Sequence, residues 1–155
     1  MAAVLGIDCV AYLNTGTTES PTWAAQGSVT GVDVSNTLAT ADITRRGGNG
    51  YRQKVGTLAE GDVTFDLIYD TTDTFFDTID EAYRERTTID MAFLSDLISV
   101  DGARGFRAAF AVTDFSESQQ LEDAIRYSVT LSVSGSAPVP GYYEALDDVL
   151  TIVGA

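Results

Sequence analysis

Residues 115–135 read FSESQQLEDAIRYSVTLSVSG, and this segment decides the fold class. Its second half alternates between large apolar side chains and mostly small polar ones. The apolar set is Ile125, Tyr127, Val129, Leu131 and Val133, and the polar set is Arg126, Ser128, Thr130, Ser132 and Ser134. Successive residues of a strand point to opposite faces of its sheet. The segment is therefore predicted to contain a long strand with one buried face and one polar face.

Two further segments repeat this pattern. In residues 61–70, apolar side chains alternate with a polar set that includes Asp62, Thr64 and Asp66. In residues 106–113, large apolar side chains alternate with Arg, Ala and Thr. Several strands that share one buried face require a sheet, so we predict a mainly β fold. The 155 residues fit one domain that spans residues 1–155.

One helix is predicted over residues 73–86, with Thr72 as its N-cap. Its apolar side chains recur at helical spacing and form a single stripe. They are Phe75, Phe76, Ile79, Ala82 and Tyr83. We expect Phe75, Ile79 and Tyr83 to anchor this helix to the sheet of the same subunit.

The two ends of the chain are predicted less specifically. Residues 3–13 are interpreted as a first strand, in which Cys9 is a small core residue. Residues 137–155 are interpreted as a C-terminal tail with one last strand or a helical turn. The N-terminus has no basic leader and the chain has no apolar run of membrane-spanning length, so we expect neither secretion nor membrane insertion.

The charges are distributed unevenly. The net charge is −14, but residues 43–59 contain four cations and no acid, which leaves −18 on the remainder. We interpret residues 43–59 as a mobile, glycine-rich loop that becomes ordered by docking on another copy's acidic body. The candidate interface residues are Arg45, Arg46, Tyr51, Arg52, Lys54 and Val55. The alternative is an ordinary exposed hairpin loop.

No residue constellation indicates catalysis. The sequence has no histidine, which rules out Ser–His and Cys–His nucleophile systems. Paired carboxylates could hydrolyse glycosides, but 23 acidic residues will form such pairs by chance. The GGNG run at 47–50 lacks the Gly-Lys-Ser/Thr ending of a phosphate-binding loop. We therefore predict a non-enzymatic protein without a cofactor or a metal site.

Four segments in order resemble the tail tube (major tail) proteins of long-tailed bacteriophages. They are NTGTTESPTW (14–23) with VTGVDV (29–34), then DITRRGGNGYRQ (42–53) before TLAEGDVTFDLIYD (57–70), then DTFFDTIDEAY (73–83) with RTTIDMAF (86–93), and LEDAIRYSVTLSVSG (121–135). Together they cover most of the chain, and their order carries the resemblance.

The resemblance implies a β-sandwich or half-barrel with one helix. It also implies six subunits in a ring, whose inner sheets join into a β-barrel, and a tube of stacked rings through which phage DNA is ejected. A polar, partly acidic lumen would repel the phosphates of the DNA, so that the DNA passes along it without binding. The candidate lumen residues are Asp62, Thr64, Asp66, Arg126, Ser128, Thr130 and Ser132.

The implied partners are other copies of the chain and the tail terminator, tip and tape-measure proteins. The implied location is the virion tail, after assembly in the host cytoplasm. The inner tubes of contractile tails and injection machines share the resemblance, and the sequence does not separate them. An alternative from another class is a soluble β-sandwich module that binds carbohydrate or a receptor.

Overall fold

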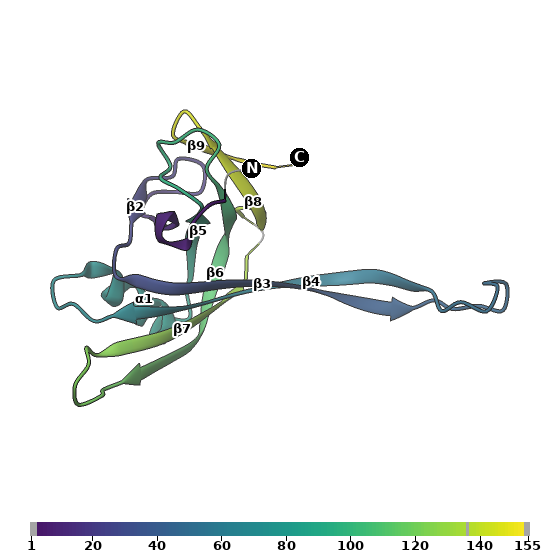
Figure 1. Cartoon of the computed structure of the whole chain (residues 1–155), viewed down its shortest axis with the longest axis horizontal. Helices are drawn as coiled ribbons and strands as arrows, with labels where there is room; N and C mark the ends of the chain where they lie inside the picture. Colours follow the sequence, from purple (N-terminus) through teal and green to yellow (C-terminus); the bar gives the residue numbers. More distant parts are fainter. Residues whose placement is uncertain (1–2, 136, 154–155) are drawn as a thin grey trace.

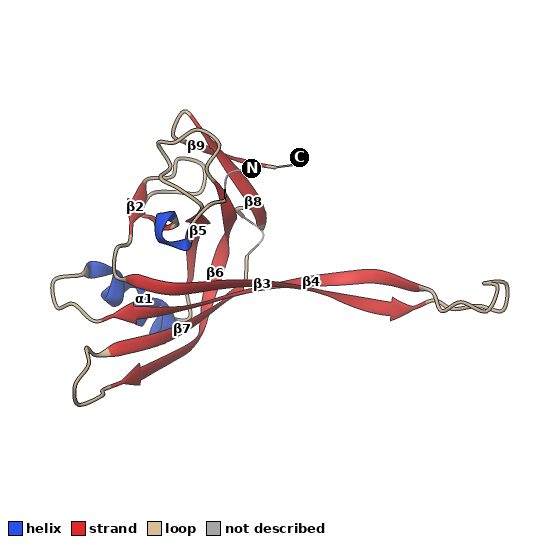
Figure 2. Cartoon of the chain, viewed as in Figure 1, coloured by secondary structure: helices blue, strands red, loops and turns tan. Residues whose placement is uncertain are grey.

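The computed structural model describes residues 3–135 and 137–153, which are mainly β with a single α-helix (Figure 2). The strands are β1 (Val10–Asn14), β2 (Trp23–Ala25), β3 (Val29–Asp42), β4 (Lys54–Ile68), β5 (Thr88–Leu94), β6 (Arg104–Ser118), β7 (Arg126–Val133), β8 (Gly141–Leu146) and β9 (Val149–Ile152). The helix is α1 (Thr74–Glu85), and a short 3₁₀ turn, η1 (Gly6–Asp8), precedes β1.

All strands belong to one antiparallel sheet that does not close on itself. Its main order is β2-β1-β5-β6-β7-β4-β3, and β8 and β9 branch from β6. The long strand β6 pairs with β5 and β8 through its first half and with β7 through its second half. At the far side of the sheet, β3 and β4 leave the body as a long two-stranded ribbon (Figure 1).

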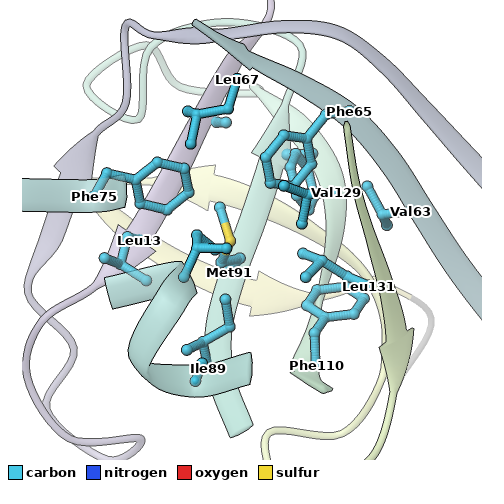
Figure 3. Packing of buried hydrophobic residues seen from close by; sticks show 14 of the residues in the cluster. Leu13, Val63, Phe65, Leu67, Phe75, Ile89, Met91, Phe110, Val129 and Leu131 are labelled. Atoms are coloured by element: carbon cyan, nitrogen blue, oxygen red, sulfur yellow. The ribbon is translucent and has the colours of Figure 1, made fainter. Parts of the chain in front are cut away.

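The main core lies between the sheet and helix α1 (Figure 3). Phe75 and Ile79 of the helix are 1% and 0% exposed, which confirms that they anchor it to its own subunit. Tyr83 is 47% exposed, but its ring centroid lies 5.9 Å from that of Phe115 of β6, so it contacts the sheet without being buried. Its position at the edge of the apolar stripe places the ring beside the core rather than in it.

The N-cap of the helix is Asp73 and not Thr72. An Asp73 carboxylate oxygen accepts a hydrogen bond from the backbone N–H of Phe75 at 3.0 Å. Thr72 instead donates its own N–H and hydroxyl to Asp70 at 2.9 and 2.8 Å. Thr72 is therefore part of the turn formed by Asp70, and the next residue, Asp73, caps the helix.

A second, smaller core covers the opposite face of the sheet around β1, β5, β8 and β9. At its border, Arg107 of β6 is buried and binds Asp90 of β5 at 2.8 Å. The Arg107 guanidinium lies over the Trp23 ring at 4.8 Å and the Tyr143 ring at 5.2 Å. Trp23 is half-buried there.

The predicted first strand is too long, because residues 6–8 form η1 and the strand begins at Val10. Val10 pairs with Leu94, the last residue of β5, so the segment before it has no neighbouring strand. Backbone N–H groups of Asp8 and Cys9 bond instead to Leu5 and Gly6. Cys9 is exposed, and the prediction that it lies in the core is wrong.

The C-terminal segment, interpreted as a tail with one strand or a helical turn, is the β8–β9 hairpin. Its two-residue turn is formed by Asp147 and Asp148, with φ of 51° and 62°. Positive φ at both positions is typical of the tight turns that join hairpin strands, and Asp tolerates it. The hairpin is part of the body, because Tyr143, Ala145 and Leu150 are buried in the second core.

Candidate functional site

The candidate lumen residues of β4 and β7 lie together on one solvent-facing side of the sheet. In the antiparallel register, Asp62 is opposite Ser132, Thr64 opposite Thr130, and Asp66 opposite Ser128. On the other face of these strands, Val63, Phe65, Leu67, Val129 and Leu131 are fully buried in the main core, and Tyr127 and Val133 are partly buried. The predicted two-faced character of these strands is therefore confirmed.

Two flanking strands extend this polar side, which we call the polar face. On β3, Asp33 is opposite Thr64 and Ser35 is opposite Asp62, whereas on β6, Asp114 is opposite Thr130. Further members share the same side by register. They are Thr30 and Thr37 of β3, Glu60 of β4, and Ser116 of β6.

Sequence reasoning missed these flanking residues because irregularities interrupt the alternation. The register of β3 shifts between Thr30 and Asp33, where Gly31 has a φ of 59°. The register of β6 shifts between Val112 and Asp114. A bulge inserts an extra residue and exchanges the two faces of a strand beyond it. The polar alternation after Gly31 was the available signal on β3.

The polar face is acidic. It carries five carboxylates, from Asp33, Glu60, Asp62, Asp66 and Asp114. The hydroxyl of Ser132 donates to one of them, Asp62, at 2.6 Å.

Arg126 is the one cation among the candidate lumen residues, and it already forms an ion pair. The Arg126 guanidinium lies 3.3 Å from the carboxylate of Asp123. The backbone N–H of Ala124, and then Arg126, hold the pKa of Asp123 below its usual range. Arg126 therefore lies at the rim of the polar face and adds little positive potential to it.

This four-stranded part of the sheet has two open edges within the described residues. β3 pairs with β4 on one side only, over a length of 14 residues. On the other side, β5 pairs with β6 only as far as Ala111, so residues 113–118 pair with β7 alone. Open edges present unpaired backbone N–H and C=O groups that can pair with another chain.

Beyond the body, residues 36–61 form a ribbon that we call the arm (Figure 1). β4 pairs with β7 only from Asp62 onward, so in the arm β3 and β4 pair with each other alone. Large apolar side chains are exposed along it, with Leu38 at 57% and Leu58 at 77%. A two-stranded ribbon is marginally stable alone in water. The arm thus has the features of an element that is completed by a partner.

The bounds predicted for the basic loop need correction. The loop between β3 and β4 is residues 43–53, because residues 54–59 already belong to β4. Lys54 and Val55 lie opposite Asp42 and Ala41 of β3. Gly56 is part of β4 and pairs with Thr40, and the Leu38 side chain lies in the space that a Cβ at position 56 would occupy.

The remaining candidates, Arg45, Arg46, Tyr51 and Arg52, lie together in this loop, which we call the arm tip. All four side chains are exposed, with Tyr51 at 77%. The tip has its own hydrogen bonds, from Gly48 N–H to the Arg45 carbonyl and from Tyr51 N–H to the Gly48 carbonyl, both at 3.1 Å. The mobility of the tip stays a prediction. The structure does not bring the tip and the polar face together.

An apolar groove of about 860 Å³ lies at the base of β3. It is lined by Val32 and Val34 of β3, by Ile7, and by Phe106 and Tyr142, among others. The groove is mainly apolar, and the polar side chains on its lining are Gln26, Thr30, Ser95 and Arg104. The described residues contain no group of three or more His, Cys, Asp or Glu side chains placed to bind a metal. They also contain no helix long and apolar enough to cross a membrane.

Solved structures with the same fold include assembled tails and tubes, although no protein-family model and no curated protein matches the sequence. One is the tail of an empty gene transfer agent particle with C6 symmetry, with a TM-score of 0.68 and 15% identity. The match covers 86% of this chain and 96% of that one. Another is the SPP1 tail tube, with a TM-score of 0.68, 12% identity, and coverage of 86% and 77%.

A third solved chain with the same fold belongs to the baseplate of the anti-feeding prophage. Its TM-score is 0.62 at 10% identity, and the match covers 87% of this chain and 94% of that one. At these identities the comparisons establish the fold. The predicted fold class, a mainly β protein of the tail tube type with one helix, is therefore confirmed, as a single unclosed antiparallel sheet.

Proposed function

We propose that this chain is a non-enzymatic structural subunit of a tail tube. The observation that carries the proposal is the acidic polar face on a four-stranded sheet with two open edges. Pairing the β3 edge of one subunit with the 113–118 edge of the next joins the polar faces around a ring. The C6 symmetry of a tail with the same fold supports a ring of six.

In the stacked tube, the polar face lines the lumen and DNA passes along it. Carboxylates repel phosphates, and small hydroxyl side chains leave the channel wide and free of cation contacts. Asp62, Thr64, Asp66, Ser128 and Thr130 are the central lumen residues. The arm, with Val55 on its strand and Arg45 and Arg46 at its tip, reaches from one ring to the next.

The lumen assignment predicts a charge effect on DNA passage. Replacing Ser128, Thr130 and Ser132 with Lys places cations on the polar face, which attract phosphates. We expect normal folding of the subunit, tubes of normal shape, and slower DNA ejection from particles built with this variant. The control is the same triple replacement by Gln, which adds length without charge. Unchanged infectivity of the Lys variant in normally shaped tubes would count against the lumen assignment.

The arm assignment predicts that Arg45→Glu with Arg46→Glu abolishes polymerisation. Surface ion pairs contribute only about 0–1 kcal/mol each, but every ring repeats the contact and the charges guide docking. The double variant is expected to keep the circular dichroism spectrum of a folded subunit and to form no tubes by negative-stain microscopy. Arg45→Lys with Arg46→Lys retains the charge and is expected to form tubes.

Wild-type tube formation should weaken with rising salt without disappearing, because screening acts on the charges and not on Tyr51 and Val55. Normal tubes from the charge-reversed variant would contradict the arm assignment. Amide exchange that shows the tip already protected in the unassembled subunit would contradict its predicted mobility. A persistent monomer that binds glycans would instead support a carbohydrate-binding module.

A further inference from the structure

Five aromatic rings follow one another at one end of the molecule, and we call them the aromatic ladder. They are Tyr83, Phe115, Tyr127, Phe76 and Tyr69, in spatial order. Consecutive ring centroids are 5.9, 5.1, 4.7 and 4.9 Å apart. The ladder joins helix α1, the end of β4 and the β6–β7 hairpin, and its two outer members remain exposed, Tyr69 at 37% and Tyr83 at 47%.

The surroundings of the ladder are acidic. Residues 70–85 and 117–126 carry nine acids and two arginines. Glu117 and Asp80 lie close enough to the ladder that, after desolvation, their carboxylates contribute to raising the pKa of Tyr127. The hairpin tip beside it exposes Leu121 completely. The surface thus combines aromatic faces with an anionic rim.

The ladder and the arm tip lie at opposite ends of the molecule. In Figure 1 the arm extends to the right, whereas the loop after β4 and the tip of the β6–β7 hairpin lie at the left. In a head-to-tail stack every copy has the same orientation. An element that projects from one end of a copy therefore meets the opposite end of a copy in the next ring.

The arm tip has the matching chemistry. It carries the guanidinium groups of Arg45, Arg46 and Arg52, the ammonium of Lys54 next to it, and the exposed ring of Tyr51. A guanidinium binds favourably over an aromatic face and also pairs with carboxylates. The same chain already uses this arrangement, because Arg107 binds Asp90 and lies over the rings of Trp23 and Tyr143.

We propose that the aromatic ladder, with its acidic rim, is the docking surface for the arm tip of a second copy of this chain in the neighbouring ring. The proposal rests on the proposed tube function and adds the receiving surface to it. Arginines of the tip lie over Tyr83 and Tyr69, and rim carboxylates such as Glu117 pair with its cations. Asp80 already pairs with Arg84 at 3.1 Å, so a tip cation that binds there shares its carboxylate.

The first test uses the fact that Lys54 is the only lysine of the chain. Wild-type tubes are treated with a carbodiimide, which joins a lysine to a carboxylate without a spacer, and the linked peptides are identified by mass spectrometry. We expect intermolecular links from Lys54 to rim acids such as Asp80 or Glu117 in tubes, and none in dilute unassembled subunits. Asp42, opposite Lys54 in the arm, serves as the internal control.

Links from Lys54 only to acids elsewhere, such as Asp62 of the polar face or Asp147 of the β8–β9 turn, would overturn the docking proposal and leave the tube function intact. Failure of the wild-type chain to form rings or tubes would instead contradict the proposed function. The two failures are therefore distinguishable in one experiment.

The second test compares two equally exposed tyrosines. Tyr83 of the ladder is 47% exposed and Tyr142 of β8 is 46% exposed. We expect Tyr83→Ser to raise the protein concentration needed for polymerisation about tenfold or more, since every subunit loses one ring contact. Tyr142→Ser is expected to polymerise like the wild type, and both variants should retain its circular dichroism spectrum. Equal losses, or no loss in Tyr83→Ser, would contradict the proposal.

Discussion

Gly105→Ala is expected to prevent stable folding of the subunit. Gly105 lies on β6 between Leu94 of β5 and Tyr143 of β8. An added Cβ would overlap the backbone carbonyl of Phe93 and lie 2.8 Å from Leu94 Cα. Both obstacles are backbone atoms, and pairing on both sides prevents β6 from moving away. We expect a loss of more than about 4 kcal/mol, a large part of the about 5–15 kcal/mol of a typical domain.

The measurement is denaturant unfolding followed by circular dichroism, at concentrations too low for assembly. Gly27→Ala is the matched control, because nothing lies within 4 Å of a Cβ at that position. Its stability should change by less than about 1 kcal/mol. Equal unfolding midpoints for the two variants would show that β6 can shift locally, contrary to the close pairing described here.

Phe75→Ala is expected to cost about 3–5 kcal/mol of subunit stability, the range for removing a buried Phe side chain. Phe75 is 1% exposed and stacks on Phe65 with ring centroids 6.2 Å apart. The variant leaves a cavity between helix α1 and the sheet. In a protein of this size the loss corresponds to a decrease of about 10 °C in the melting temperature.

The control for Phe75→Ala is Glu81→Ala on the exposed side of the same helix, for which we expect a change within about 0.5 kcal/mol. Melting temperatures of the unassembled subunits compare the two. If Phe75→Ala melted like the wild type and only polymerisation suffered, the apolar stripe of the helix would face another subunit instead of its own sheet.

The sequence by itself determined the local patterns of this protein. Alternation in residues 125–134 and 61–70 predicted strands with one buried and one polar face, and the stripe around Phe75 and Ile79 predicted the helix. The cation-rich arm tip was visible as a charge imbalance. These patterns are readable because the direction of a side chain depends on the period of its own backbone, which neighbouring residues in the chain share.

Only the tertiary structure decided which of these segments meet. Asp33 and Asp114 join the polar face because bulges in β3 and β6 exchange their faces, and a bulge depends on the pairing of two strands distant in sequence. The arm is long because β7 stops pairing with β4 at Asp62. The aromatic ladder is assembled from α1, β6, β7 and the residue that follows β4. Such features depend on long-range register and on which edges find partners, and no local period of the sequence encodes either of them.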